Sequence, residues 1–330
     1  MTLNHLRRTL TVTVLASLAL AGCGGGAAPP TTPPSSAPTS EAPSSSSSPA
    51  PAVPAAPEVD GMVVHASEYD VAETAERVSA ALEEAGMVVA TVDHAAGAAS
   101  VGQQLRPTTL VIGGAPMAGT PLMLEQQRAG VDLPQKYLAW EDEDGEVFLG
   151  YNSADYIAAR AGIAPDSDAL ATARMGSAGV AATASGNAEP LSEGAEQVTS
   201  EGYLVEATSD TTVAEAIARY ETAFAAKDLM LVGTVDHAAG AASVDAMLRP
   251  TSTTFVGNPM VGTKLLQASQ TFGIDLPVRY VAWEDADGVV HVAHPDIRVL
   301  AERHGATGVD EVLAMVETAT GAFTDTAAGS

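Results

Sequence analysis

The sequence predicts an α+β protein that contains two copies of one small domain. The run Asp93–Val101 returns letter for letter as Asp236–Val244. From these runs the copies stay in phase without a gap, so that Gly162 in the first copy matches Gly305 in the second. Each copy carries a full set of helix and strand signals, which indicates a duplicated domain rather than a solenoid. Hairpin signals between neighbouring strands favour an antiparallel sheet with helices on one face, an α+β sandwich.

The first elements of each copy are a strand, a helix and a second strand. The run Met62–Ala66 predicts a short strand. Asp70 and Glu73 form a capping box for a helix whose apolar residues follow at helical spacing until Gly86. The apolar run Met87–Val92 predicts a buried strand. The second copy repeats the last two signals at Thr212, Glu215 and Met230–Val235.

A third strand, a short helix, a hairpin of two strands and a last helix complete each copy. Thr120 as N-cap with Pro121 at the first helical position predicts the short helix, and Asp144–Gly145 is a hairpin turn signal. In the first copy we expect these elements over Thr108–Gly113, Leu122–Ala129, Tyr137–Asp142, Glu146–Tyr151 and Ala154–Ala161. The clearest matches in the second copy are Thr253–Gly257, Asp287–Gly288 and Ile297–His304.

The N-terminus carries a processing signal. Basic residues precede the apolar run Leu10–Ala21, which is too short to cross a membrane because a spanning helix needs about twenty residues. The tetrapeptide Leu20–Cys23 resembles a bacterial lipobox, which implies cleavage before Cys23, lipidation of its sulfur and a stable membrane anchor. An ordinary secretory signal with a leftover cysteine is the alternative, and Arg7–Arg8 is an incomplete twin-arginine pattern. Cys23 is the only cysteine, so the mature domains have no intramolecular disulfide and no cysteine metal site.

Composition sets the remaining domain boundaries. The segment after Cys23 consists almost entirely of Pro, Ser, Thr, Ala and Gly, so it predicts a disordered stalk. We divide the chain into a lipoprotein signal peptide (1–22), the lipidated cysteine and stalk (23–59), a first repeat domain (60–163), a low-complexity linker (164–201), a second repeat domain (202–320) and a disordered tail (321–330). The expected location is the outer face of the cytoplasmic membrane. The formal net charge of −26 argues against nucleic acid as a partner, because an acidic surface repels phosphate.

Five spaced motifs occur in both copies and point to a family. In the first copy they are Asp93–Ala98, Leu105–Thr108, Gly114–Thr120, Asp132–Pro134 and Trp140–Gly145. This set resembles the bacterial domain of unknown function 302 over most of both copies. The resemblance implies a fold similar to that of the TATA-binding protein, with a strand and a helix followed by four strands and a helix. It implies no DNA binding and leaves the activity open, because a shared fold does not carry function.

The best candidate functional residues are His94 and His237. Each follows a predicted strand, comes directly after an acid, Asp93 or Asp236, and precedes a run of small residues. Small residues allow close approach of a ligand, and the acid could orient the imidazole, so these residues predict a ligand contact. The alternative is a structural histidine whose ring bonds a backbone carbonyl and fixes the turn.

The predicted loop Gly114–Thr120 offers a second candidate. Backbone amides ahead of a helix N-terminus can hold an anion, although a helix-entry turn explains the same pattern and Pro121 replaces the cationic side chain of Lys264. Met117 and Met260 could join the histidines in a soft copper site, or pack against the core. The candidate ligand-binding residues are therefore His94, His237, Asp93, Asp236, Met117, Met260, Gly119, Gly262, Thr120 and Thr263.

Other polar residues do not form a site in the predicted fold. His291 and His294 are three apart on a strand and should face opposite ways, as should the neighbours Glu141 and Asp142. The leading hypothesis is a non-catalytic lipoprotein without a cofactor or metal that binds an unidentified small molecule or protein. A histidine-dependent enzyme and a copper-binding protein are the alternatives. We also expect the two copies to pack as a pseudo-twofold pair through the strands that carry Trp140 and Trp283.

Overall fold

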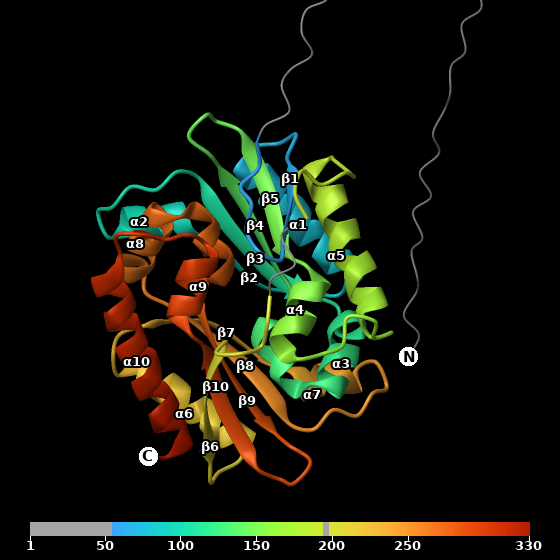
Figure 1. Cartoon of the computed structure of the whole chain (residues 1–330), viewed down its shortest axis with the longest axis vertical. Helices are drawn as coiled ribbons and strands as arrows, with labels where there is room; N and C mark the ends of the chain where they lie inside the picture. Colours follow the sequence, from blue (N-terminus) through green and yellow to red (C-terminus); the bar gives the residue numbers. More distant parts are fainter. Residues whose placement is uncertain (1–54, 194–197) are drawn as a thin grey trace, which may run out of the picture. The chain divides into compact units, whose positions relative to one another are not determined.

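A computed structural model describes residues 55–193 and 198–330 (Figure 1). The predicted signal peptide, Cys23 and the stalk up to residue 54 lie outside the described residues. Both repeats belong to one compact unit, Ala52–Ser330. Among the described residues, no helix has the combination of length and apolar character that crossing a membrane requires.

The first repeat is a five-stranded antiparallel sheet with helices. Its elements are β1 (Met62–Ala66), α1 (Val71–Ala85), β2 (Met87–Asp93), α2 (His94–Ser100), β3 (Thr108–Gly114), α3 (Pro116–Glu125), the 3₁₀ helix η1 (Gln127–Asp132), β4 (Lys136–Glu141), β5 (Val147–Asn152), α4 (Ala154–Ala161) and α5 (Leu170–Ser185). The strand order is β1-β5-β4-β3-β2. The predicted α+β sandwich is therefore confirmed.

The second repeat has the same architecture. Its elements are β6 (Leu204–Ser209), α6 (Val213–Ala225), β7 (Met230–Asp236), α7 (His237–Ala242), β8 (Thr251–Gly257), α8 (Pro259–Ala268), the 3₁₀ helix η2 (Gln270–Asp275), β9 (Val278–Glu284), β10 (Val290–Pro295), α9 (Ile297–Arg303) and α10 (Asp310–Ala328). The strand order, β6-β10-β9-β8-β7, repeats that of the first sheet.

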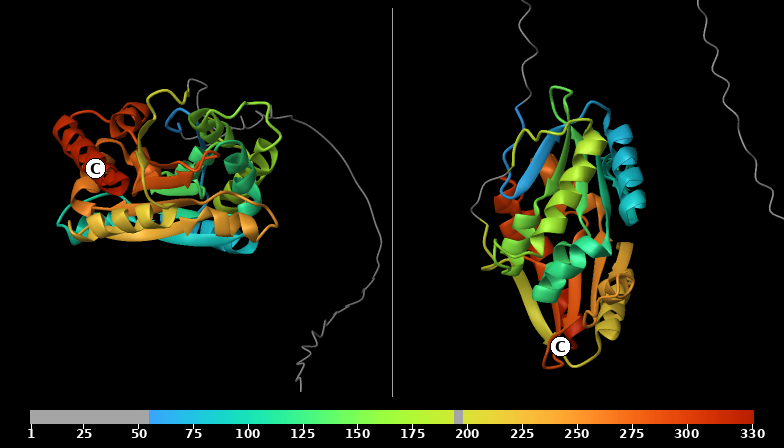
Figure 2. Two further views of the ribbon diagram at one scale, coloured as in Figure 1. Left: turned by 90° about the horizontal axis from the view of Figure 1, so that it is seen from below. Right: turned by 90° about the vertical axis from the view of Figure 1, so that its right-hand side faces the viewer.

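Helices cover one face of the first sheet. The Asp70 carboxylate accepts a hydrogen bond of 2.8 Å from the Glu73 amide and so caps α1, as its sequence predicts. The apolar side of α1, including Val78 and Leu82, packs with α5 against the strands. The right-hand view of Figure 2 shows α1, in blue and cyan, along one side of this sheet. In the second repeat α6 and α10 take the corresponding places.

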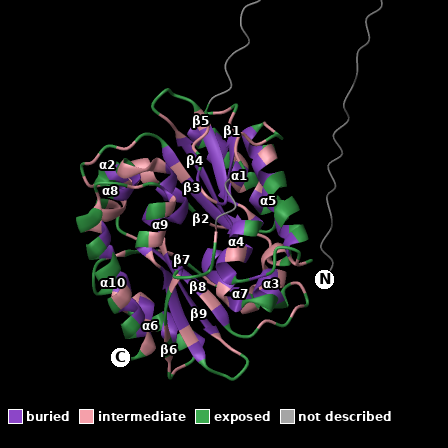
Figure 3. Ribbon diagram, viewed as in Figure 1, coloured by how far each residue is buried: buried purple, intermediate pink, exposed green. Residues whose placement is uncertain are grey.

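The opposite face of each sheet packs on the other repeat. Trp140 and Leu138 of β4 share a buried cluster with Ile274 of η2, and Trp283 of β9 shares one with Val131 of η1. Each 3₁₀ helix therefore lies against the sheet of the other repeat. Figure 3 shows the central strands of both sheets as the most buried parts of the molecule.

The predicted linker and tail were wrong in part. Residues 170–185 form α5, whose buried residues Ala181 and Ala184 pack with α1. Residues 310–328 form α10, and the Phe323 ring meets the Phe224 ring edge-on at 5.2 Å. The residues of α5 are mostly Ala, Gly, Ser and Thr, whose short side chains bury little area and give a weak periodic signal. Of the predicted linker, residues 164–169, 186–193 and 198–201 lie outside the named helices and strands, and residues 194–197 lie outside the described residues.

Two further expectations were wrong. β2 and β7 are edge strands with mostly intermediate or exposed residues rather than buried ones. α3 begins at Pro116, so Thr120 is a buried residue within the helix and Pro121 lies inside it. Proline is favoured at the first position of a helix, and both Pro116 and Pro121 could take that position. The helix begins at the earlier one, Pro116. The predicted loop Gly114–Thr120 is consequently a strand end and the first turns of a helix.

Candidate functional site

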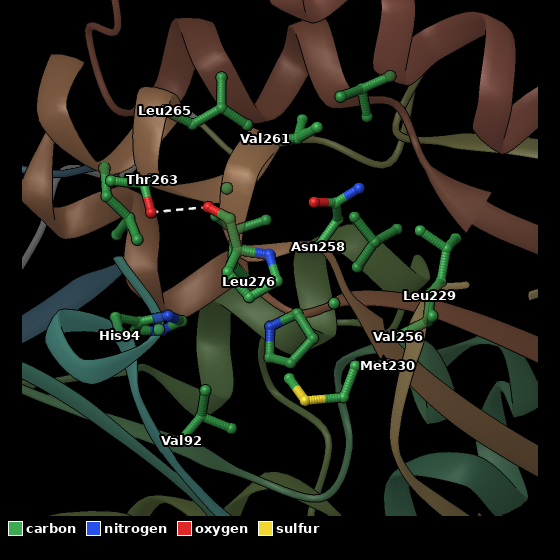
Figure 4. Close-up of a pocket in the computed structure, with 18 of the residues that line it drawn as sticks. Val92, His94, Leu229, Met230, Val256, Asn258, Val261, Thr263, Leu265 and Leu276 are labelled. Carbon is green, nitrogen blue, oxygen red and sulfur yellow. Dashed lines mark hydrogen bonds between the residues drawn. The ribbon is translucent and has the colours of Figure 1, made fainter. Parts of the chain in front are cut away.

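Two of the pockets between the repeats contain a candidate histidine. The first, here called the His94 pocket, has a volume of about 240 Å³ and combines His94 with the β8–α8 connection and α10 of the second repeat (Figure 4). The second, the His237 pocket, measures about 570 Å³ and combines His237 with the β3–α3 connection and α5 of the first repeat. Each pocket is therefore built from both repeats. One repeat supplies the histidine and the other supplies the strand-to-helix connection and the last helix.

The His94 ring is held by the other repeat. It bonds the backbone of Gly273 at the centre of η2, and burial lowers the pKa of His94 to about 4. The ring is therefore neutral at pH 7. Its Nε2 is buried and has no hydrogen-bond partner among the described residues.

His237 is bonded in a related way but has an extra partner. Its ring bonds the backbone of Gly130 in η1, and burial lowers its pKa to about 4. Its Nε2 lies 3.1 Å from the Thr253 hydroxyl oxygen, which is itself 2.7 Å from the Gly130 carbonyl oxygen. In the gapless match between the copies Leu110 stands where Thr253 stands, and a leucine cannot supply this bond. The two histidines therefore differ in the hydrogen bonding of Nε2, which has a threonine partner in His237 and no hydrogen-bond partner among the described residues in His94.

The acids beside the histidines have a different role from the expected one. The Asp93 carboxylate accepts a 2.8 Å bond from the Ala96 amide, and the Asp236 carboxylate accepts a 2.9 Å bond from the Ala239 amide. Each is the N-cap of the short helix that its histidine begins. The expectation that these acids orient the imidazoles was wrong, because a backbone carbonyl from the other repeat does so. Each ring bonds a backbone group of the other repeat rather than one in its own turn.

The remaining candidate residues separate into pocket and surface. Gly262 and Thr263 line the His94 pocket, and the Thr263 hydroxyl donates a 2.7 Å bond to the Pro259 carbonyl (Figure 4). Gly119 and Thr120 line the His237 pocket, where the Thr120 hydroxyl is buried without a partner among the described residues.

The methionines do not join the histidines. Met117 and Met260 are 64% and 56% exposed and line neither pocket. The proposed histidine–methionine copper site is therefore not assembled. Within the described residues no group of three or more His, Cys, Asp or Glu side chains could hold a metal ion.

Sequence reasoning missed a buried cluster of charges between the repeats. Asp132 and Asp275 end the two 3₁₀ helices, and Arg279 bonds both, at 2.7 Å and 3.0 Å. The Tyr203 hydroxyl donates to Asp132 at 2.8 Å, and Arg303 pairs with Asp275 at 2.9 Å. All these side chains are almost completely buried. The two acids stand at equivalent positions of a repeated motif, which was the available signal.

This cluster also contains a lysine without a hydrogen bond. Lys136 Nζ lies 3.6 Å from Asp132 and 4.0 Å from Asp275, and it has no hydrogen-bond partner among the described residues. Burial, together with the charge of Arg279, lowers the pKa of Lys136 to about 8. Burial would raise the pKa of Asp275, but Arg279 and Arg303 hold it well below its usual range. The cluster lines neither pocket, so it joins the repeats rather than contacting a ligand.

The other polar residues occupy structural positions. The His291 ring stacks on Trp283 at 4.9 Å, whereas His294 is buried with Nδ1 2.7 Å from the Thr324 hydroxyl. The Asp142 carboxylate accepts bonds from the amides of Asp144 and Glu146 within the hairpin. His291 and His294 therefore lie on opposite faces of β10, as their spacing predicts.

Comparison with known proteins identifies related sequences. The family model described as Domain of unknown function DUF302 matches residues 63–178 and 205–323. Proteins named Fluoride-specific ion channel FluC 1, from Brucella suis and Brucella abortus, are 45% identical over 117 residues. That match covers 35% of this chain and 46% and 43% of theirs, so the chain spans about half the length of the curated relatives it matches. A solved structure of a DUF302 protein from Bacillus stearothermophilus, 17% identical, covers 38% of this chain and 98% of its own, with a TM-score of 0.36.

Proposed function

Because the chain belongs to the DUF302 family and carries two copies of its domain, we propose that it is a non-catalytic protein whose two inter-repeat pockets bind small molecules. The observation that carries the proposal is the composite nature of the pockets. Each places a histidine of one repeat, partly buried for His94 and buried for His237, against a helix start of the other. Concave, largely apolar sites with few polar groups are typical of ligand binding.

The state of the histidines favours binding over catalysis. A general base works best when its pKa is near the working pH. The pKa of about 4 for both histidines makes them weak bases at neutral pH. The neighbouring acids Asp93 and Asp236 are engaged as helix caps and do not raise the basicity through a direct bond.

We place this function at the outer face of the cytoplasmic membrane. The support is the lipobox at Leu20–Cys23 and the proline-rich segment that follows it. Channel activity is not extended from the Brucella relatives, since the chain matches less than half of their length. Cell fractionation tests the anchor: Cys23→Ser should move the protein from the membrane to the soluble fraction. Unchanged membrane retention would contradict a lipid anchor at this residue.

A ligand screen tests the binding proposal. The mature chain from residue 23, carrying Cys23→Ser, is heated with a library of metabolites, and compounds that raise the melting temperature are retained. His94→Asn and His237→Asn should each weaken the hits of one pocket. His291→Asn, on the strand β10 and outside both pockets, is the matched control and should weaken none. Hits that respond to neither pocket variant, or an absence of hits, would contradict the proposal.

A further inference from the structure

Apolar side chains of both repeats form most of the wall of the His94 pocket. Val92 comes from β2 of the first repeat, whereas Val256 and Leu276 come from the second (Figure 4). Phe323 of α10 also lines the pocket. A small molecule that enters therefore exchanges water mainly for carbon atoms, and this exchange is favourable for an apolar ligand.

The polar groups of the lining offer a ligand few hydrogen bonds. The Thr263 hydroxyl donates a bond of 2.7 Å to the Pro259 carbonyl. His94 Nε2 and the Tyr280 hydroxyl oxygen are buried inside the protein and have almost no accessible surface. A ligand cannot reach these two atoms, so contact with carbon atoms has to supply most of its binding free energy.

A charged ligand would also lack a partner in this pocket. The described residues that line it include no Lys or Arg, and Asp93, the one acid among them, caps α2. The start of α8 does not present a free amide to an anion, because Pro259 has no N–H and the Asn258 side chain accepts the bond of the Met260 amide. A carboxylate or phosphate would therefore lose its hydration without compensation.

The size and the rim of the pocket indicate a compact ligand. A cavity of about 150 Å³ holds a benzene molecule in another protein, so about 240 Å³ accommodates roughly one to two rings. Met230 and Met315 line the pocket and remain 50% and 49% exposed. Flexible thioether side chains adapt to apolar ligands of different shape.

From this geometry we propose that the His94 pocket binds a compact, uncharged and apolar ring compound, which is held by contact with carbon atoms and not by a hydrogen bond. The inference rests on the proposed binding function and specifies the ligand class for one of the two pockets. The His237 pocket is more polar, because Gln135 lines it at the position that Val278 takes in the gapless match. The two pockets therefore differ in polarity as well as in volume.

Isothermal titration calorimetry with three probes that share one ring system tests the ligand class. Naphthalene is apolar, 2-naphthol adds a hydroxyl, and 2-naphthoate is charged at neutral pH. The mature chain with Cys23→Ser is titrated into each probe and should bind naphthalene. It should bind 2-naphthol no more tightly, because the hydroxyl loses water without gaining a partner, and 2-naphthoate about tenfold more weakly or less.

Variants of α10 locate the binding. Ala319 lines the pocket and is exposed, so the indole of Ala319→Trp should fill the mouth of the pocket and weaken naphthalene binding about tenfold or more. Ala314→Trp places the same side chain at an exposed residue of the same helix outside the lining, and it should leave the affinity unchanged. Ala319→Leu is a smaller change in the same direction, and it replaces Ala319→Trp if the melting temperature shows that the latter is unstable.

The outcomes separate this inference from the proposed function. If 2-naphthoate binds as tightly as naphthalene and Ala319→Trp abolishes both, the pocket binds ligands but the class is wrong. A tenfold preference for 2-naphthol that Ala319→Trp abolishes also overturns the class, because it requires a hydrogen bond. Naphthalene binding that both Ala319 variants leave unchanged overturns the assignment to this pocket.

The metabolite screen supplies the remaining distinction. If none of the three probes binds while the screen finds ligands sensitive to His94→Asn, the ligand class fails alone. The failure of both experiments overturns the pocket itself.

Discussion

At the scale of single residues, replacement of a charged side chain buried between the repeats should change the free energy of unfolding most. Two carboxylates, Asp132 and Asp275, lie among Arg279, Arg303 and Lys136, and all five side chains are almost completely buried. Such a cluster is stable only while every charge keeps its partners, because an unpaired buried charge is costly. The arrangement fixes how the repeats join, since Arg279 of the second repeat bonds Asp132 of the first.

Removing one member of this cluster should destabilise the protein strongly. Arg279→Met removes the nearer of the two cations that Asp132 and Asp275 share, and we expect a loss of about 3–5 kcal/mol in the free energy of unfolding. Urea denaturation followed by circular dichroism measures it. Arg174→Ala breaks an exposed pair with Asp155 and should cause little change. Equal effects of the two variants would show that the buried cluster contributes no more to stability than an exposed ion pair.

The buried histidines predict a pH dependence. Burial lowers the pKa of His94, His237 and His294 to about 4, so in the folded state they stay neutral. Between pH 6.5 and about 4 the unfolded chain binds more protons than the folded one, and stability therefore falls as the pH falls. Below this window the carboxylates with lowered pKa, Asp132 and Asp275, add a further loss.

Urea unfolding between pH 7.5 and 4 measures this slope. The parent chain should lose a few kcal/mol across the window, the order of magnitude for shifts of this size. The double variant His94→Asn, His237→Asn should show a shallower slope, because two of the histidines with a lowered pKa are absent. A free energy of unfolding that stays constant from pH 7 to pH 5 would contradict the neutral, buried state of these histidines.

At the scale of elements, local signals located most of each repeat but not its last helix. β1 and α4 have the predicted bounds, because an apolar run or an N-cap and a terminal glycine mark them. α5 was missed because its buried face consists largely of small residues. α10 does carry Leu313, Val316 and Phe323 at helical spacing, a signal that the division into a domain and a tail at residue 320 cut in two. The sequence predicted single residues of the candidate site but not which residues of the two repeats meet there. His94 and Gly273 are far apart in the sequence, and no local pattern shows that they meet across the repeats.

The C-terminal helix should contribute substantially to stability. Phe323 of α10 packs on Phe224 and also lines the His94 pocket. Phe323→Ala should lower the free energy of unfolding by about 3–5 kcal/mol, as for other large-to-small changes in a core. Met175→Ala, at a residue 70% exposed on α5, is the control and should stay within about 0.5 kcal/mol of the parent. Chemical denaturation of both variants decides whether α10 is part of the core or a dispensable tail.

At the scale of the whole molecule, the pairing of the repeats creates both pockets. Each repeat leaves one sheet face uncovered until the 3₁₀ helix of the other lies on it, as Ile274 does beside Trp140. The same exchange brings Gly130 and Gly273 to the two histidines. A single DUF302 domain of this type would therefore have neither a covered sheet nor a complete pocket.

This dependence predicts that an isolated repeat associates with itself. The second repeat alone, residues 198–330, exposes the face of β9 that carries Val281 and Trp283. Because the intact interface uses equivalent surfaces of the two repeats, two copies can cover each other in the same way, and a symmetric homodimer should form. Size-exclusion chromatography with light scattering should give the mass of a dimer, and Trp283→Asp should prevent dimerisation by placing a charge in the apolar contact. A monomer that unfolds cooperatively would contradict the prediction, because it would mean that one repeat closes its own core and that the pockets arise from a secondary contact between independent domains.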